Sequence, residues 1–445
     1  MDFTTSSVPM AGLLPELWAM IFSHLAGDYR TLCSLSLTSK AWRSTSLPAL
    51  LEVVDLSSHN AGRQQSHETP WRGPVYADFH ARYRPVELRL LSRQRAFLRL
   101  LTRRPELARH VRTLVWTFVW IDLEEFELTA IDCETWNVFA RMPGITHLDL
   151  ASLHAVWNDD YVRQSPPVLF PALKYLRLLG WMHRGLVKAV LASPNARKLR
   201  KIDLDYLEDE GALPDGKPIG RSIVYDHARH MERTCKIDCV SAELLARQDT
   251  GQAFIFPGPN WFSLHLLLAQ QLPFLTHLRV KVAHFNHHTD LRNYATMFKN
   301  AADLLVKTRN TLQILEITFN VPYEATGAPG FQAAMQDMLG TYQITSIRMT
   351  TLFVGNLLVS FRAEAFPCLK RVKLNGFYYR EMDAATVQFQ AEAAKLADAV
   401  QTLRDYLPGG VELIEVPSES RRKSFVGYEI VGQGVGEYRH LLEGS

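Results

Sequence analysis

The chain has 445 residues, 47% of them hydrophobic, which is enough for two or three domains with large buried cores. Its 49 basic and 46 acidic residues leave a net charge of +3, which argues against a dedicated nucleic-acid-binding protein. Five scattered cysteines do not suggest a disulfide framework, and no apolar run approaches the ~18 residues that cross a membrane. No signal peptide is evident. We therefore expect a protein of the cytoplasm and/or nucleus, with neither a nucleic-acid nor a membrane partner.

Residues 1–12 are small and polar and are predicted to form a short lead-in. An amphipathic helix is predicted to follow them. The apolar residues of this helix recur at helical spacing: Leu14, Leu17, Trp18, Ile21, Phe22 and Leu25. Pro15 suits the first helical turn, where its missing N–H is not needed, and Glu16 suits the positive helix start. Gly27 tolerates a positive φ and is predicted to end the helix.

A second helical pattern follows the first and is predicted to end at Pro48. Its positions are Leu32, Leu35, Ser39 and Trp42. Together the two patterns predict a hairpin or trio of helices of about 40 residues, close to the lower limit for a self-sufficient core. We expect such a unit to need a partner that covers its remaining apolar face.

Residues 13–50 resemble the F-box motif, with a Leu-Pro pair at the start of the first helix and a Trp-Arg pair at the end. The matching residues are Leu14-Pro15-Glu16-Leu17, Ile21-Phe22, Leu25, Leu32, Leu37 and Trp42-Arg43. Thr38 and Ser39 depart mildly from the motif, because many members carry Val-Cys or Val-Ser there. The alternative is an ordinary helical N-terminus.

The F-box resemblance implies binding to the small Skp-type adaptor of a cullin–RING ubiquitin ligase. The residues implied in adaptor binding are Leu14, Pro15, Glu16, Leu17, Ile21, Leu25 and Leu32. Phe22 and Trp42 are expected to hold the helices together as the F-box core.

Residues 51–110 are predicted to form a segment that connects the N-terminal helices to the rest of the chain. Val53, Val54 and Leu56 indicate a short strand, and residues 57–85 a long surface connection without a period. A helix is predicted over residues 88–107, with an apolar stripe at Leu90, Leu91, Phe97, Leu98 and Leu101 and arginines at Arg93, Arg95, Arg99, Arg103 and Arg104. The arginines are either a solvated helix face, which we favour, or an anion site.

The remainder, residues 111–445, contains a repeat of the form apolar-x-x-apolar-x-apolar. Its nine copies are Val111/Leu114/Trp116, Ile145/Leu148/Leu150, Leu173/Leu176/Leu178, Leu199/Ile202/Leu204, Leu275/Leu278/Val280, Leu312/Leu315/Ile317, Ile344/Ile347/Met349, Leu369/Val372/Leu374 and Val411/Ile414/Val416. Alternate apolar residues predict a strand, and helix-like stretches follow Gly185 and Arg292. One β–α unit cannot bury its own apolar face, so neighbouring units must stack.

The repeat is similar to a leucine-rich repeat, although the asparagine that often follows the strand is mostly missing. The fold class implied is α/β: a helical F-box followed by an irregular leucine-rich-repeat-like solenoid with a mostly parallel, curved sheet. The interval from residue 202 to residue 278 is expected to hold a loop, one degenerate unit and a helix after Ile255. A closing helix is predicted at residues 383–407 and a last strand at residues 425–431.

No pattern of residues indicates catalysis or a cofactor. Cys235 and Cys239, with His227 and His230 upstream, have a spacing that zinc sites allow, but no second cysteine pair follows. The cluster of His284, His287, His288 and Asp290 is interpreted as a surface loop. We therefore expect no catalytic residue, no metal and no cofactor.

The resemblances together predict the substrate-recognition subunit of a Skp–cullin–F-box ubiquitin ligase, which holds a protein substrate on its repeat domain. Two alternatives remain open: an F-box scaffold that works outside the ligase, and a sensor that binds a small anion on the repeat face near the arginine helix.

Overall fold

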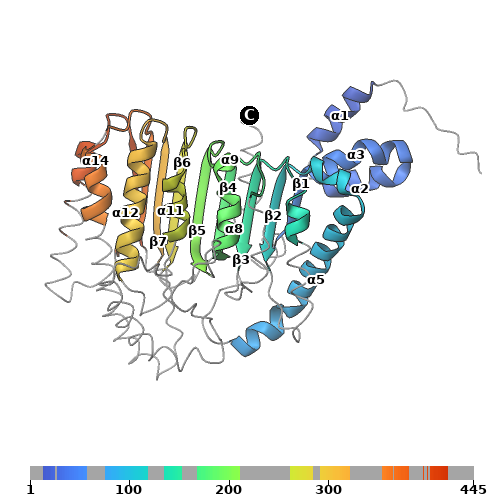
Figure 1. Ribbon diagram of the computed structural model, residues 1–445, viewed down its shortest axis with the longest axis horizontal. Coiled ribbons are helices and arrows are strands. Elements are labelled where there is room, and N and C mark those ends of the chain that lie inside the picture. Colours follow the sequence, from blue (N-terminus) through green and yellow to red (C-terminus); the bar gives the residue numbers. More distant parts are fainter. Residues whose placement is uncertain are drawn as a thin grey trace, which may run out of the picture.

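A single parallel sheet with helices on one side forms the centre of the protein, as the computed structural model in Figure 1 shows. The structure describes residues 14–25, 28–57, 76–118, 135–152, 168–210, 261–283, 291–320, 353–363, 365–379, 394, 398 and 401–418. Within these ranges the fold is α/β, with nine parallel strands in the order of the sequence, β1 to β9.

Each strand pairs in parallel with the one that follows it along the chain, so the order of strands in the open sheet is the order of the sequence. The strands are β1 (Val53–Leu56), β2 (Thr113–Phe118), β3 (His147–Ser152), β4 (Tyr175–His183), β5 (Lys201–Glu210), β6 (His277–Ala283), β7 (Ile314–Asn320), β8 (Arg371–Tyr379) and β9 (Glu412–Ser418). Parallel neighbours need a return connection, and the described helices between the strands lie on one face, in front of the sheet in Figure 1.

The helices fall into an N-terminal group and a group that packs on the sheet. The N-terminal group is α1 (Pro15–His24), α2 (Tyr29–Thr38) and α3 (Lys40–Glu52), next to α5 (Tyr76–Arg103) and the short helix η1 (Pro105–His110). The second group is α8 (Arg184–Val190), α9 (Ser193–Ala196), α11 (Trp261–Ala269), α12 (Leu291–Thr308), the π-helical turn η3 (Phe353–Leu358) and α14 (Val359–Ala363). Residues 401–406 are also helical.

The apolar positions of the repeat form the core, as the sequence predicted. The central position lies in one register through seven strands: Leu114, Leu148, Leu176, Ile202, Leu278, Leu315 and Val372. All seven side chains are buried, in one apolar cluster that runs from Leu51 to Leu403 and includes the inward faces of α8, α11 and α12. Parallel stacking of the repeats is therefore confirmed for these strands.

Two repeats differ from the prediction. The segment Leu51-x-x-Val54-x-Leu56 has the repeat spacing, and β1 pairs with β2 through Val54 and Leu114, so the sheet begins with this strand. The last repeat is displaced by one residue, because Leu413, and not Ile414, aligns with Val372. Leu413 packs against the core, as the two-residue period of a strand requires.

Three further expectations are corrected. Pro48 lies inside α3, which continues to Glu52, and the break falls at Ser39, whose hydroxyl caps α3 by accepting a hydrogen bond from the Trp42 N–H. Helix α5 begins at Tyr76, within the predicted surface connection. β5 pairs directly with β6, so the interval between them adds no strand at that place in the sheet.

Several predicted features lie outside the described residues. They are the repeat at Ile344, Ile347 and Met349, the strand at residues 425–431, the cysteines Cys235 and Cys239 with His227 and His230, and the cluster of His284, His287, His288 and Asp290. β7 and β8 pair directly with each other.

A row of alternating charges crosses the sheet on the face opposite the helices. The residue between the two apolar strand positions is Asp149 in β3, Arg177 in β4, Asp203 in β5, Arg279 in β6, Glu316 in β7 and Lys373 in β8. Arg177 lies 3.2 Å from Asp149 and 3.7 Å from Asp203, which also contacts Arg279, and Lys373 lies 3.1 Å from Glu316. Each charge therefore has a partner of opposite sign on a neighbouring strand.

Candidate functional site

The three N-terminal helices form a small unit with its own apolar core at one end of the sheet, on the right in Figure 1. Phe22, Leu32 and Ala49 are buried there, and partly buried apolar residues surround them: Trp18, Leu25, Leu35, Trp42 and Leu50. This core is separate from the large core under the sheet. The N-terminal unit is therefore a distinct packing unit that contributes its own surface.

Aromatic rings hold α1 against α3. The ring of Trp42 makes edge contacts with Trp18, at a centroid distance of 4.6 Å, and with Phe22, at 5.5 Å. The neighbouring Arg43 donates a hydrogen bond from Nε to the carbonyl oxygen of Ser36, which ties α3 to α2. The Trp-Arg pair therefore acts inside the unit, and Phe22 and Trp42 pack together between α1 and α3.

The start of α1 follows from its sequence. Leu14 is extended and precedes Pro15, which occupies the first turn without an N–H to satisfy. The N–H groups of Leu17 and Trp18 donate to the carbonyl oxygen of Leu14. The helix ends at His24, three residues before Gly27, which lies outside the described residues.

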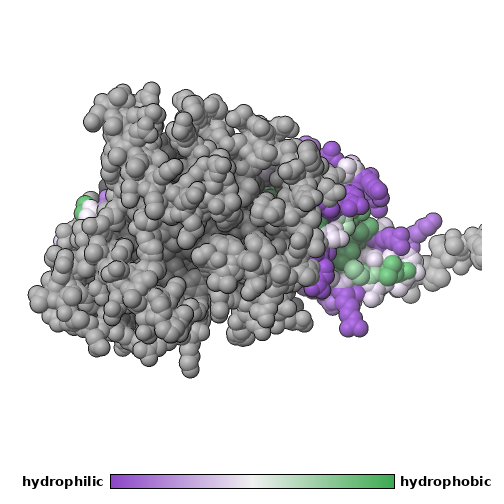
Figure 2. All heavy atoms as spheres, turned by 90° about the horizontal axis from the view of Figure 1, so that it is seen from below, coloured by the Kyte–Doolittle hydropathy of each residue, from purple (hydrophilic) through white to green (hydrophobic). Residues whose placement is uncertain are grey.

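One face of α1 is apolar and exposed. Leu14 is 66% exposed, Met20 58%, Leu17 41% and Ile21 40%. These four residues, which we call the α1 stripe, share a side of the helix next to the side that carries Trp18 and Phe22. Figure 2 shows hydrophobic side chains exposed among hydrophilic ones over the N-terminal helices. A clustered apolar surface of this kind is typical of a protein–protein contact.

The residues predicted to bind an adaptor do not all lie on this surface. Leu14, Leu17 and Ile21 belong to the α1 stripe, Glu16 is exposed beside it, and Pro15 opens the helix. Leu25 is half-buried and packs against the unit's core. Leu32 is 0% exposed, so it has no surface to offer a partner and is reassigned to the core.

Two exposed apolar residues were not predicted as interface residues from the sequence: one lies in the α1 stripe and the other on α2. Met20 lies three residues after Leu17, which was a helical signal for the same face. Leu37, which belongs to the motif but was not assigned to the interface, is 76% exposed on α2.

The predicted arginines, in α5 and at Arg104 just after it, do not form a shared anion site within the described residues. Arg99 and Arg103 are exposed, Arg104 forms an ion pair with Glu106 at 2.9 Å, and Arg93 donates a weak hydrogen bond to the carbonyl oxygen of Asp55 at 3.4 Å. The buried side of α5 instead carries Gln94, whose amide donates to the carbonyl oxygens of Leu56 and Thr117. The arrangement fits a solvated helix face.

Two further observations concern the described residues. No group of three histidine, cysteine or carboxylate side chains among them is placed to hold a metal ion. No helix in the described ranges combines the length and the hydropathy needed to cross a bilayer.

The class of protein that the described residues define is an α/β repeat protein with an open parallel sheet and a separate helical unit at its N-terminal end. Searches of family models, of curated proteins and of solved structures found no significant match to this chain.

Proposed function

We propose that this protein is the substrate-recognition subunit of a Skp–cullin–F-box ubiquitin ligase. In this proposal the N-terminal unit is an F-box that binds a Skp-type adaptor, and through it a cullin. The sheet with its helices is an irregular leucine-rich-repeat-like domain that holds a protein substrate. The chain supplies proximity and orientation, and ubiquitin transfer takes place elsewhere in the complex.

The observation that carries the proposal is the α1 stripe. The N-terminal unit buries Phe22 and Leu32 and packs the partly buried Trp42 against them, yet leaves Leu14, Leu17, Met20 and Ile21 of α1 exposed. Burying an apolar side chain stabilises a protein by roughly 1.5–3 kcal/mol, so this exposure is unfavourable unless a partner covers it. The motif resemblance then supports an adaptor as that partner.

The test is a binding measurement with a purified Skp-type adaptor. Leu17→Ala with Ile21→Ala removes two exposed anchors of the stripe and preserves helix propensity. Anchors cost about 2 kcal/mol or more each, so the affinity should fall at least tenfold. The matched control is Phe274→Ala, which removes an exposed apolar side chain, 59% exposed, from the segment before β6.

Circular dichroism should show unchanged helix content in both variants. Undiminished binding by the folded double variant would reject the assigned surface, and failure of the wild type to bind would reject the F-box assignment. Co-purification with a cullin separates a ligase subunit from a scaffold that binds the adaptor alone.

A further inference from the structure

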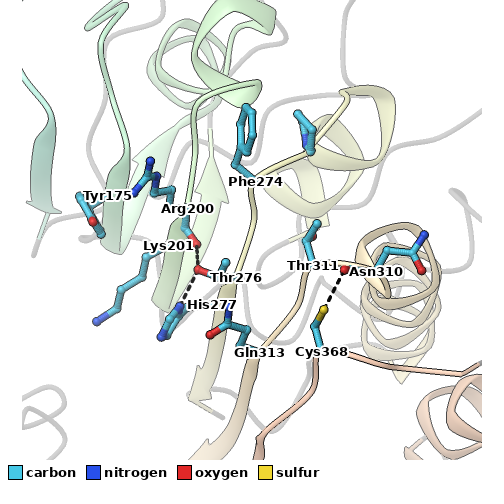
Figure 3. A pocket seen from close by; sticks show the side chains of 11 residues that line it. Tyr175, Arg200, Lys201, Phe274, Thr276, His277, Asn310, Thr311, Gln313 and Cys368 are labelled. Carbon is cyan, nitrogen blue, oxygen red and sulfur yellow. Dashed lines mark hydrogen bonds between the residues drawn. The ribbon is translucent and has the colours of Figure 1, made fainter. Parts of the chain in front are cut away.

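A pocket of about 490 Å³ opens where strands β4 to β8 begin, far from the α1 stripe along the sheet. Figure 3 shows Tyr175, Arg200 and Lys201 on one side of it and Asn310 and Cys368 on the other. Thr276, His277, Thr311 and Gln313 lie between them, and Pro273 and Phe274 complete the lining. The described lining combines two cations, several hydrogen-bonding groups and an exposed aromatic ring, with no acidic side chain.

The pocket belongs to a longer row of residues at the strand entrances, which we call the rim. The rim consists of Lys174, Arg200, Thr276, Gln313 and Lys370, one before each of β4 to β8. Successive members are joined by backbone hydrogen bonds, in which each N–H donates to the preceding member's carbonyl oxygen at 2.8 or 2.9 Å. The parallel register therefore places side chains from residues 174 to 370 in one line.

The cations of the rim, and the adjoining Lys201 at the start of β5, are not neutralised by neighbouring carboxylates in the part of the chain that the structure describes. Within the described residues, Lys174, Arg200, Lys201 and Lys370 form no ion pair, whereas the adjoining Arg371 pairs with Glu412 at 2.6 Å. The local field also acts on His277: burial, followed by the charges of Lys201 and Lys370, lowers its pKa to about 4. A positive row without counter-charges is suited to an anionic ligand.

The length of the rim favours an extended ligand over a compact one. From β4 to β8 there are four strand-to-strand steps, which at about 4.8 Å each span about 19 Å. An extended peptide covers this distance with about six residues. The rim residues form a single row along the strand entrances, a shape that fits an extended chain and not a broad polyphosphate.

We propose that the rim is a binding site for an extended acidic peptide segment, with Arg200 and Lys201 pairing with its carboxylates and Phe274 contacting an apolar residue of the same segment. The polar side chains of Thr311, Asn310 and Gln313 provide hydrogen bonds to its backbone. Peptide binding by the rim stands independently of the adaptor surface. Only its assignment as the place where a ubiquitin-ligase substrate is held rests on the proposed function.

The test uses the purified full chain and fluorescein-labelled peptides of about ten residues, longer than the rim requires. In one peptide glutamates alternate with serines around a central phenylalanine, and in a second each glutamate is glutamine. Fluorescence anisotropy should give a Kd on the order of 10 µM for the acidic peptide and at least about tenfold weaker binding for the neutral one.

Two double variants with the same change of charge locate the site. Arg200→Glu with Lys201→Glu should weaken binding at least about tenfold, and the milder Arg200→Gln with Lys201→Gln should weaken it in the same direction if the first variant folds poorly. Arg99→Glu with Arg103→Glu, on the exposed face of α5, should leave the Kd within about twofold.

Absence of binding, or equal weakening by the rim and α5 variants, would overturn the proposal. Tighter binding of a single-stranded oligonucleotide that is lost in the rim variant would assign the rim to nucleic acid instead. None of these measurements includes the adaptor, so their failure is distinct from failure of the proposed F-box function.

Discussion

At the scale of single residues, a Thr-His pair recurs at the entrances of two strands. Thr146-His147 precedes the core leucine of β3, and Thr276-His277 precedes that of β6. In both, the threonine hydroxyl lies within hydrogen-bond distance of the histidine Nδ1, at 2.9 and 2.8 Å. The hydroxyl also lies near a backbone carbonyl oxygen, that of Arg112 for Thr146 and that of Arg200 for Thr276. The ring of His147 additionally stacks on Tyr175 at 4.2 Å.

These two histidines should make the stability of the protein depend on pH. Burial, followed by nearby lysines, lowers the pKa of each from 6.5 to about 4. Between these pH values the unfolded chain binds more protons than the folded protein does. The free energy of unfolding is therefore highest above pH 6.5 and falls as the pH is lowered toward 4. We expect a loss of roughly 1–3 kcal/mol per histidine.

The measurement is chemical denaturation between pH 7.5 and 4 of wild type and of His147→Gln with His277→Gln. The double variant should show a flatter decline of the free energy of unfolding. His24→Gln, at an exposed position on α1, is the control and should follow the wild type. An unchanged slope in the double variant would contradict the assignment of these histidines.

At the scale of elements, α5 has one face exposed to solvent and another face that is buried against the sheet. Replacing Arg99 and Arg103 together by alanine should change the free energy of unfolding by no more than about 0.5 kcal/mol per site, because both are exposed. The contrasting variant is Gln94→Ala. It removes the buried amide that joins β1 to β2, together with the hydrogen bonds that it donates to the carbonyl oxygens of Leu56 and Thr117, at a cost of about 1–3 kcal/mol. Urea denaturation measures both, and equal effects would contradict this division of the helix.

The strands show how far periodicity predicts a fold and where it stops. Apolar spacing located β2 to β8 because one face of each strand is buried in the same core. In the last strand, apolar residues occur in both alternations, Val411 with Leu413 and Ile414 with Val416, so spacing alone cannot choose the buried face. Pairing with Val372 decides it.

The site was predictable to different degrees for physical reasons. Helical spacing found Leu14, Leu17 and Ile21, but it does not distinguish a core position from an interface position, so Leu32 was misassigned until packing was known. The rim was missed because its members are separated by up to 196 positions, from Lys174 to Lys370, and only the parallel register aligns them. A signal existed in the residue just before each of β4 to β8, which is polar in every case.

At the scale of the whole molecule, two cores of unequal size meet at α3, which contributes Ala49 to the small core and Leu51 to the large one. The Tyr29 hydroxyl donates to the carbonyl oxygen of Val53 at 2.5 Å and so links α2 to β1. Burial, followed by the charge of Asp55, raises the pKa of Tyr29 to about 12. The N-terminal unit has a much smaller buried core than the sheet, so it should unfold locally at a lower free energy than the sheet does.

Hydrogen exchange followed by mass spectrometry should show this difference. Amides of α1 are expected to exchange faster than those of β3 to β7 in the free protein, and a bound adaptor should slow exchange in α1 more than in the sheet. Equal protection of α1 and the central strands would indicate a single cooperative unit and contradict this view.

The alternating charges of the sheet limit how a protein of this kind gains or loses length during evolution. Removing one strand unit from the run between Asp149 and Lys373 would place two like charges on adjacent strands, for example Asp149 beside Asp203, in a largely buried row. Removing two consecutive units restores opposite neighbours. Descendants of such a sheet are therefore expected to differ by even numbers of repeats, with the pair of units as the heritable module.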